Sequence, residues 1–387
     1  MTRKSPVGAF KSFGKKKWLS FGGWINAVIP VLIVPYYSVI GGWVIKYLVE
    51  YFRGNAKLLA EDGYFTDFIS NGVSTELCFV AFCAFTLIII FAGVQNGIER
   101  VSKIMMPILI VLSVIIAVYS VTRPGALAGV KYFLVPNVKN FSWMTVVSAM
   151  GQMFYSLSIA MGILITFGSY MKKDTAIEDS TRNVEIFDTG IAIMAGLMII
   201  PAVFAFSGGD PDTLQAGPSL MFITIPKVFQ NMGFGTVIGI VFFLLVLFAA
   251  VTSSIALTES AVSTFEDELG WGRKKATVLV GVIMLALGSL SSLGYGPLAG
   301  IKIIGMQFLD LFDFLTNSVM MPIAALLTSL FVSRVVGIDK IEAEIIHGES
   351  AFRRKKVFVV MIKYLCPVFA IIILLSSVAN ALGWIKM

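Results

Sequence analysis

A short polar stretch inside an apolar segment is the first place where this chain could bind a ligand. Residues 148–170 read SAMGQMFYSLSIAMGILITFGSY, which is long and apolar enough to cross a bilayer. Ser156 and Ser158 lie within it, beside several glycine and alanine residues. Irregular backbone at membrane depth is tolerated where it lines a cavity or is buried in protein. We therefore interpret Tyr155–Gly162 as a break in a spanning helix, although close packing through small residues also explains this composition.

A second set of candidate ligands shares one helical face. Its members, spaced i, i+3, i+4, i+7 and i+8, are Ala249, Thr252, Ser253, Ala256 and Leu257. The face is small and hydroxylated, and hydroxyl and carbonyl oxygens are the ligands that a hard cation needs. The pattern indicates a site for a monovalent cation, and Ser and Thr that only pack helices are the alternative.

Four carboxylates fall inside apolar segments. Asp188 is costly there unless it is paired or faces a polar cavity, and a bound cation is its natural partner. Glu259 is a weaker candidate, since it lies towards the end of its segment and could reach water. Asp310 and Asp313 open another segment, where Asp often only complements the helix dipole. No nucleophile–His–acid set, HExxH or P-loop accompanies them, so we do not expect an enzyme.

These candidates must be positioned by membrane helices. The chain has 387 residues, of which 57% are hydrophobic and 14% charged, which predicts an all-α polytopic membrane protein. We expect about nine spans by apolar length. They are Gly22–Val49, Glu76–Val94, Ile104–Val121, Ser148–Tyr170, Ile186–Phe206, Val237–Phe265, Ala276–Leu293, Phe308–Val335 and Lys355–Leu382.

The connections are expected to be loops. Gln95–Lys103 is interpreted as a tight turn, and Met171–Glu185 and Gly337–Arg354 as charged loops. Gly208–Gly235 is expected to hold a re-entrant or surface helix at Leu220–Gln230.

Lysine and arginine set the expected orientation. One set of loops carries most of them, and its basic groups are Lys15–Lys17, Arg100, Lys172–Lys173, Arg273–Lys275 and Arg353–Lys356. Basic loops face the cytoplasm, so the N-terminus is expected inside and, after an odd number of spans, the C-terminus outside a plasma membrane. The charges are scattered and lack interleaved aromatic residues, which argues against a nucleic-acid surface.

Several segments together resemble the neurotransmitter:sodium symporter family, and its bacterial amino-acid transporters most of all. They are GQMFYSLSIAMG (151–162), PYYSVIGGW (35–43), GVQNGIERVSKIMMP (93–107), AGPSLMFITIP (216–226), FAAVTSSIAL (248–257) and EDELGW (266–271). The resemblance implies two inverted repeats of five helices with discontinuous helices at mid-membrane, a geometry for which the leucine-transporter member of the family is the standard example.

The resemblance also implies a domain plan. The whole chain, 1–387, is one transmembrane transporter domain, with a cytoplasmic segment at 1–20 and the rest of the first repeat at 21–122. The second repeat covers 143–336, and an extra helix covers 355–383. The family's first two spans have no counterpart, so either the protein starts upstream or the chain is a truncated membrane protein that does not transport and needs a partner supplying those helices.

By resemblance, the chain imports a small, hydrophobic amino acid or an amine with sodium. Ser156 and Asp188 match ligands of a first sodium site, where most relatives have Asn at the second position. Ala249, Thr252 and Ser253 match a second sodium site. Residues matching the substrate site are Ile33, Tyr37, Tyr155, Ser158, Met161, Ser253 and Leu257.

Gating residues follow from the same resemblance. Tyr155 matches an outer aromatic lid, usually Phe, and Asp313 matches the acidic half of an outer gate. Gly97 and Pro107 match a Gly-nine-Pro spacing linked to unwinding on the cytoplasmic side. Chloride is not expected as a cofactor, because Ala192 replaces the usual chloride-binding Ser and Asp188 already supplies a fixed negative charge.

Overall fold

The computed structural model describes residues 1–14, 16–210, 214, 217–381 and 383–384. Over these residues it is helical, with one isolated bridge between Ile303 and Met306 in place of a sheet. Eight helical segments of the described chain are long and apolar enough to cross a membrane. They are Lys17–Phe52 (α2), Gly72–Phe91 (α5), Val94–Val121 (η1 and α6), Ile177–Ser207 (α10), Gly235–Leu269 (α13), Arg273–Leu293 (α14), Phe308–Val336 (α15, η5, α16 and η6) and Lys355–Ala381 (α18, η7 and α19).

The expected all-α membrane fold is thus confirmed. The remaining expected span is the interrupted one, formed by α8 (Trp143–Ser156) and α9 (Ile163–Tyr170). The predicted end of the last span, Leu382, lies outside the described residues, and α19 (Cys366–Ala381) ends just before it.

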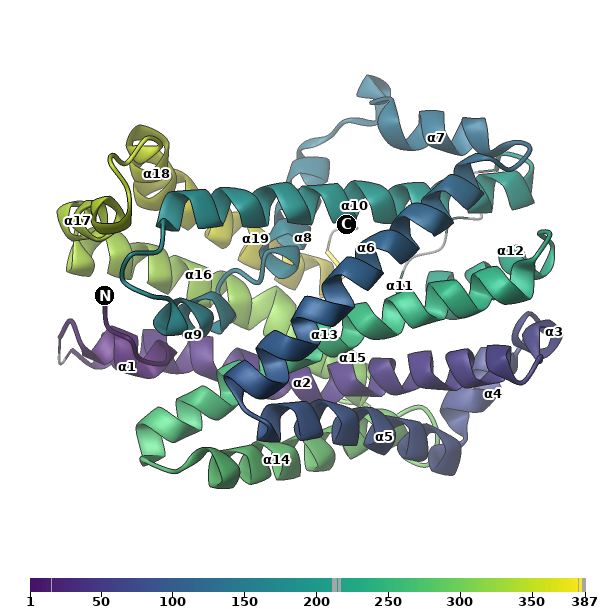
Figure 1. The fold of residues 1–387 in the computed structure, drawn as a ribbon, viewed down its shortest axis with the longest axis horizontal. Helices are drawn as coiled ribbons and strands as arrows, with labels where there is room; N and C mark the ends of the chain where they lie inside the picture. Colours follow the sequence, from purple (N-terminus) through teal and green to yellow (C-terminus); the bar gives the residue numbers. More distant parts are fainter. Residues whose placement is uncertain (15, 211–213, 215–216, 382, 385–387) are drawn as a thin grey trace.

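Helix α2 lies at the centre of the bundle and packs against α13, α5 and α14 (Figure 1). Two glycines make the contact with α5 possible. A Cβ at Gly41 would lie 2.5 Å from the Phe82 ring, and one at Gly42 would lie 2.7 Å from the backbone nitrogen of Phe79. Tyr47 and Tyr51, near the C-terminal end of α2, are also buried. Helix α2 is therefore closely packed by its neighbours along much of its length.

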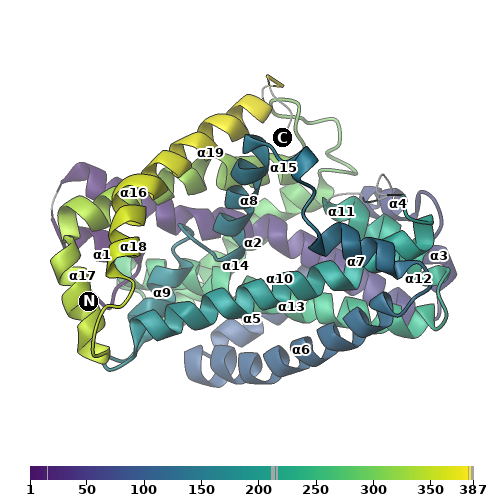
Figure 2. The same ribbon diagram turned by 90° about the horizontal axis from the view of Figure 1, so that it is seen from above.

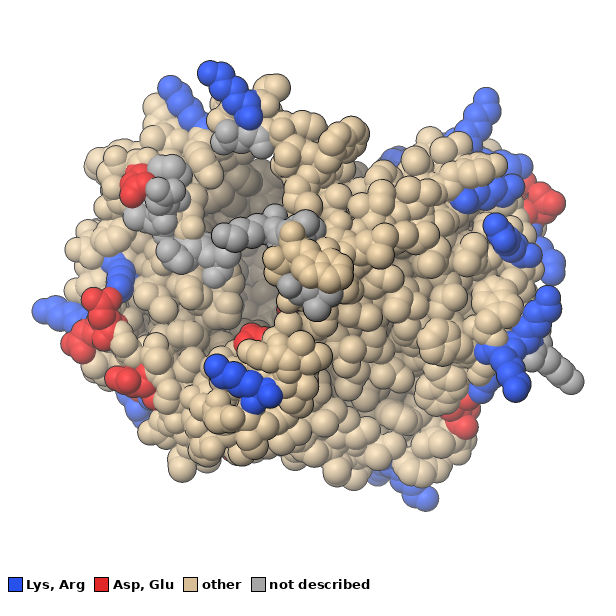
Figure 3. Space-filling model, turned by 180° about the vertical axis from the view of Figure 1, so that it is seen from behind, with Lys and Arg blue, Asp and Glu red and all other residues tan. Residues whose placement is uncertain are grey.

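The loops predicted to share one side of the membrane do lie together. At one end of the molecule Lys11 pairs with Glu268, and Arg273 donates to the carbonyl of Ile90. At the opposite end Lys227 pairs with Asp62. Figure 3 shows an uncharged belt between two ends that carry the charged side chains. The alternation of the spans is therefore consistent with the predicted topology.

Three connections expected to be turns or loops are helical instead. Gln95–Lys103 is not a tight turn, because η1 (Val94–Glu99) continues directly into α6 (Arg100–Val121). The second half of the expected loop Met171–Glu185 belongs to α10, and the expected loop Gly337–Arg354 contains α17 (Ile338–Gly348). These helices continue beyond their apolar core into polar sequence. A prediction based on apolar length alone assigns such polar sequence to a loop.

Shorter helices cover the ends of the spans. They are α1 (Pro6–Lys11), α3 (Ala56–Leu59), α4 (Tyr64–Ser70), α7 (Ala126–Leu134), η2 (Val138–Asn140), α11 (Gly217–Ser219), η4 (Leu220–Thr224) and α12 (Ile225–Gln230). The last two form the helix predicted at Leu220–Gln230, and they bury Phe222, Val228 and Phe229. This prediction is confirmed.

Candidate functional site

The predicted break in residues 155–162 is present. Helix α8 ends at Ser156 and α9 begins at Ile163 (Figure 2). Between them, Ser158 and Ala160 have φ angles of 54° and 61°. The left-handed conformation is uncommon for residues with a side chain, so the chain leaves the helical path there. The amides of Leu157, Ser158 and Ile159 still donate to carbonyl oxygens of α8, so the backbone groups that this turn offers a ligand are carbonyl oxygens.

Gly162 closes the break at a crowded position. Its φ is 72°, and a Cβ there would lie 2.8 Å from the backbone oxygen of Asn26. Glycine alone tolerates this conformation and this approach at low cost. The break is therefore held against α2 on one side, and its geometry is fixed by close packing.

The first pair of expected sodium ligands is brought together at the break. The hydroxyl of Ser156, the last residue of α8, donates to Oδ1 of Asp188 on α10 at 2.6 Å. Both side chains retain access to solvent. An oxygen pair from two helices, next to an interrupted backbone, is an arrangement suited to a small cation.

The second set of expected sodium ligands lies on α13. Thr252 donates its hydroxyl to the backbone oxygen of Ala249 at 3.0 Å, so these two oxygens are adjacent. Helix α13 packs against α2, and Ser253 of this face is exposed. The predicted face of α13 thus carries hydroxyl and carbonyl oxygens that lie next to one another on one helix.

The expected substrate-lining residues are largely buried. Ile33, Met161 and Leu257 are buried apolar side chains of one contiguous core cluster, and Tyr37 and Tyr155 pack against it. Ser158 lies in the break itself. The apolar residues come from α2, the break and α13, three elements that are distant in sequence and belong to the same core cluster.

An open cleft of about 750 Å³ leads away from the break. Its walls are α8, the start of the span Phe308–Val336, and α19. Tyr155, Asp310 and Asp313 all line it. Tyr155 therefore lies where the buried substrate residues meet the cleft, and Asp313 lies on the facing wall.

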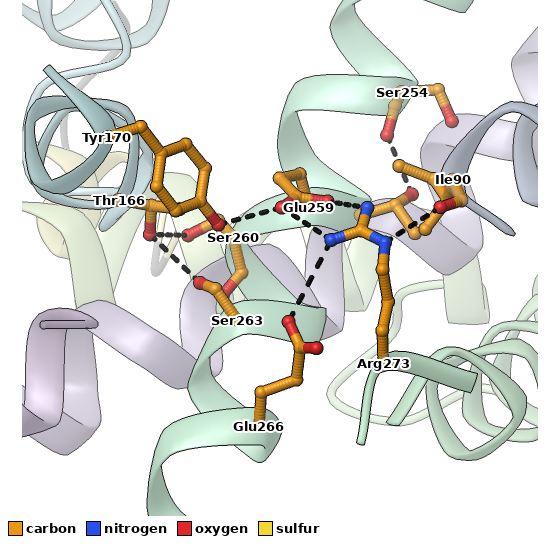
Figure 4. Close-up of polar contacts among 10 residues, drawn as sticks. Ile90, Thr166, Tyr170, Ser254, Glu259, Ser260, Ser263, Glu266 and Arg273 are labelled. Atoms are coloured by element: carbon orange, nitrogen blue, oxygen red, sulfur yellow. Dashed lines mark hydrogen bonds and ion pairs between the residues drawn. The ribbon is translucent and has the colours of Figure 1, made fainter. Parts of the chain in front are cut away.

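A buried ion pair occupies the opposite half of α13 (Figure 4). Glu259 is fully buried, and its carboxylate accepts from Nη1 and Nη2 of Arg273 at 3.0 and 2.5 Å. Tyr170 of α9 donates its hydroxyl to Glu259 Oε1 at 2.7 Å. The expectation that Glu259 reaches water is wrong, because the first residue of α14 folds back to neutralise it.

A cluster of hydroxyls continues this contact between α9 and α13. Thr166 lies 3.3 Å from the hydroxyl oxygens of both Ser260 and Ser263, as Figure 4 shows. The second half of the broken helix is therefore attached to α13 by polar contacts at these positions, beside the apolar packing of Phe167.

Gly97 and Pro107 lie in a helical segment with irregular turns. Gly97 belongs to the π-helical turn η1, and Pro107 lies inside α6. Proline cannot donate to the preceding turn, and glycine lowers helix propensity. Their expected part in unwinding stays a prediction, because the segment is wound in this structure.

Comparison with known proteins gives the family. The model of the Sodium:neurotransmitter symporter family matches residues 65–384. The chain belongs to the sodium:neurotransmitter symporter family. The sequence-based recognition is thereby confirmed, and the fold and the sodium dependence of this family apply to the chain.

Individual members of the family align over almost the whole chain. An uncharacterized sodium-dependent transporter of Bacillus subtilis, YhdH, is 33% identical over 96% of this chain and 82% of its own length. One from Haemophilus influenzae is 30% identical over 97% of this chain and 84% of its own. The crystal structure of MhsT in complex with L-phenylalanine has a TM-score of 0.84 at 33% identity, covering 97% of this chain and 85% of that chain.

Four polar residues of this site were missed from the sequence. Arg273 and Tyr170 are the partners of Glu259, and Tyr36 and Asn317 are partners of Asp313. Asn317 follows Asp313 by four residues, a helical spacing that could have shown the contact. Arg273, Tyr170 and Tyr36 make their contacts between helices, and no local sequence pattern predicts such contacts.

Proposed function

We propose that the chain imports a small hydrophobic amino acid together with sodium by alternating access. The observation that carries this proposal is the contact of Ser156 with Asp188 beside the broken helix. Sodium would take oxygens of these two side chains and of the freed backbone. The negative charge of Asp188 then favours a cation at a depth where an unpaired carboxylate is costly.

A second sodium would be held by α13. The adjacent oxygens of Ala249 and Thr252 and the hydroxyl of Ser253 supply uncharged ligands. Tyr37, which would receive the substrate carboxylate, lies on α2, and α13 packs against this helix. Binding of sodium and of substrate would thus be coupled through the contact between these two helices.

The side chain of the substrate would lie among Ile33, Met161 and Leu257. These are buried and apolar, so they favour a hydrophobic amino acid. The related structure of MhsT holds L-phenylalanine, which supports the same substrate class.

Transport would begin at the open cleft. Sodium and substrate enter there, and Tyr155 and Asp313 close over them, while Gly97 and Pro107 let the other end of the path open. The sodium gradient drives accumulation only if the bound ligands favour the closed form. We place the basic loop end in the cytoplasm of a plasma membrane and the C-terminus outside, with residues 21–122 and 143–336 as parts of two inverted repeats.

We also propose that transport is independent of chloride. Asp188 carries a fixed negative charge on α10, and Ala192, one helical turn further, offers no hydroxyl for an anion. Uptake that stops when chloride is replaced by gluconate would contradict this part of the proposal.

The test is uptake by the purified chain in liposomes. An inward sodium gradient should drive accumulation of labelled phenylalanine or leucine, and an equal potassium gradient should not. D188N should raise the sodium concentration for half-maximal uptake by about tenfold or more. D179N is the matched control, since Asp179 lies on the same helix in an exposed pair with Arg182. Uptake without sodium dependence, or equal effects of both variants, would refute the proposal.

A further inference from the structure

We propose that Asn317, supported by Tyr36, is a positioning residue that orients the carboxylate of Asp313 at the cleft. Asn317 Nδ2 donates to Asp313 Oδ1 at 2.5 Å, and the Tyr36 hydroxyl lies 3.3 Å from the same oxygen. The inference rests on the proposed function, in which Asp313 takes part in closing the outer path.

The two donors come from different elements. Asn317 lies four residues after Asp313 on η5 (Phe314–Met320), so their side chains share a helical face. Tyr36 reaches across from the central helix α2 and is 2% exposed. The carboxylate of Asp313 is therefore held both by its own helical segment and by the central helix α2.

Both donors engage the same oxygen. Across the described part of the chain, hydrogen bonds to the Asp313 carboxylate are found at Oδ1, whereas Asp313 itself is exposed and lines the cleft. When Oδ1 of Asp313 is held in this way, Oδ2 is left to contact a ligand that enters the cleft. An ionised carboxylate with a free oxygen is an acceptor for an ammonium group, such as that of an amino acid on its way in.

Tyr36 lies beside a residue of the candidate substrate site. Its neighbour in sequence, Tyr37, packs against the core cluster that holds Ile33 and Leu257. Adjacent residues of a helix point about 100° apart, so α2 presents one tyrosine to the Asp313 carboxylate and the next to this core.

The substitutions remove these donors without leaving new unpaired groups. N317A deletes an amide whose Oδ1 is already buried without a partner in the described structure. Y36F deletes a hydroxyl next to Thr316, and Thr316 keeps its own bond to the Phe312 carbonyl at 2.7 Å. The matched controls are N231A, which deletes an amide bonded to Lys227 O, and Y47F, which deletes a buried hydroxyl bonded to Phe222 O.

The experiment is a double-mutant cycle with D313N in the uptake assay. N317A should raise the KM for the amino acid about fivefold to tenfold with little change in the maximal rate, and Y36F should raise it less. Neither should add to the effect of D313N, because each acts through that carboxylate. N231A and Y47F should leave KM unchanged. Additive effects, or KM values for N317A and Y36F equal to wild type, would overturn the inference.

A second measurement separates this inference from the proposed function. Wild-type chain that shows no sodium-driven uptake would count against transport, and a structure of the N317A variant would still decide the position of Asp313. We expect its carboxylate to turn away from Tyr36. An unchanged side-chain conformation in N317A would overturn the positioning role, whatever the uptake assay gives.

Discussion

Replacing Glu259 with glutamine tests the buried ion pair that joins α13, α14 and α9. The change keeps the volume of the side chain and removes its charge. Arg273 then keeps its hydrogen bond from Nε to the carbonyl oxygen of Ile90 at 3.0 Å and its contact from Nη1 to Glu266 Oε2 at 3.8 Å. It loses the Glu259 carboxylate that neutralises its charge. Tyr170 loses a charged acceptor and retains a neutral one.

The size of the effect follows from burial. Removing one partner of a buried ion pair costs about 3–5 kcal/mol, because the other charge is left uncompensated. Arg273 is 23% exposed, so water relieves part of this cost. We expect E259Q to destabilise the protein by about 2–3 kcal/mol. At about 2 °C per kcal/mol for a chain of this size, the melting temperature should fall by about 4–6 °C.

The assay is thermal unfolding of the purified chain in detergent, followed by a dye that reacts with thiols. Cys83 is 1% exposed in the fold, so its reaction with the dye reports unfolding. The matched control is E99Q, which removes the same charge from an exposed pair, Glu99 with Lys103. Exposed pairs of this kind contribute little, so E99Q should shift the melting temperature by less than about 1 °C.

A double variant tests whether the loss of stability comes from the uncompensated charge of Arg273. E259M/R273M replaces the pair with apolar side chains and should recover most of the loss, because buried ion pairs exchanged for apolar groups are often neutral. The reasoning is refuted if E259Q melts within about 1 °C of wild type, or if E259M/R273M is no more stable than E259Q.

Three further outcomes are expected. T252A should raise the sodium concentration for half-maximal uptake about tenfold, since one ligand oxygen is lost, and a sodium titration of uptake measures this. L257A should lower the affinity for phenylalanine about fivefold to a hundredfold, because a buried apolar contact is removed, as competition assays would show. Lys227 holds the pKa of the Asp62 carboxyl below its usual range. The stability that wild type has over D62N should therefore persist above about pH 4 and vanish as the pH falls through the lowered pKa, which melting curves across pH would follow.

The sequence predicted the spans because an apolar stretch of about 20 residues or more is stable when it lies in the membrane interior, away from water. It also predicted the break, because left-handed backbone at Ser158 and Ala160 falls inside a run of small and polar residues. It failed at helix ends. The turns before Asp188 on α10 are polar yet helical, and hydropathy does not separate a polar helix from a polar loop. Helix α17 does carry a helical pattern, with Ile338, Ile341 and Ile345 spaced i, i+3 and i+7, but a search by apolar length alone does not detect it.

Within the site, the sequence could predict contacts along a helix and not contacts between helices. Thr252 lies three residues after Ala249, so their adjacency follows from helical geometry. The pairing of Ser156 with Asp188 depends on how α8 and α10 are rotated, which apolar spacing does not fix; the resemblance to a family supplied it. Glu259 was misread for the same reason, as its neutralising partner begins the next helix.

The positions of these contacts explain how one helix can serve two ends of the molecule. The candidate sodium oxygens at Ala249 and Thr252 lie together on α13, whereas Glu259, about two turns further along the same helix, is fixed to α14 by a buried ion pair. Tyr170, at the end of the broken helix, donates to that same carboxylate. Movement of α9 away from α13 would therefore break the hydrogen bonds of Tyr170 and Thr166 to α13 and leave the ion pair intact. Helix α13 would stay anchored to α14 while α9 moves, which is what a fixed ion site needs.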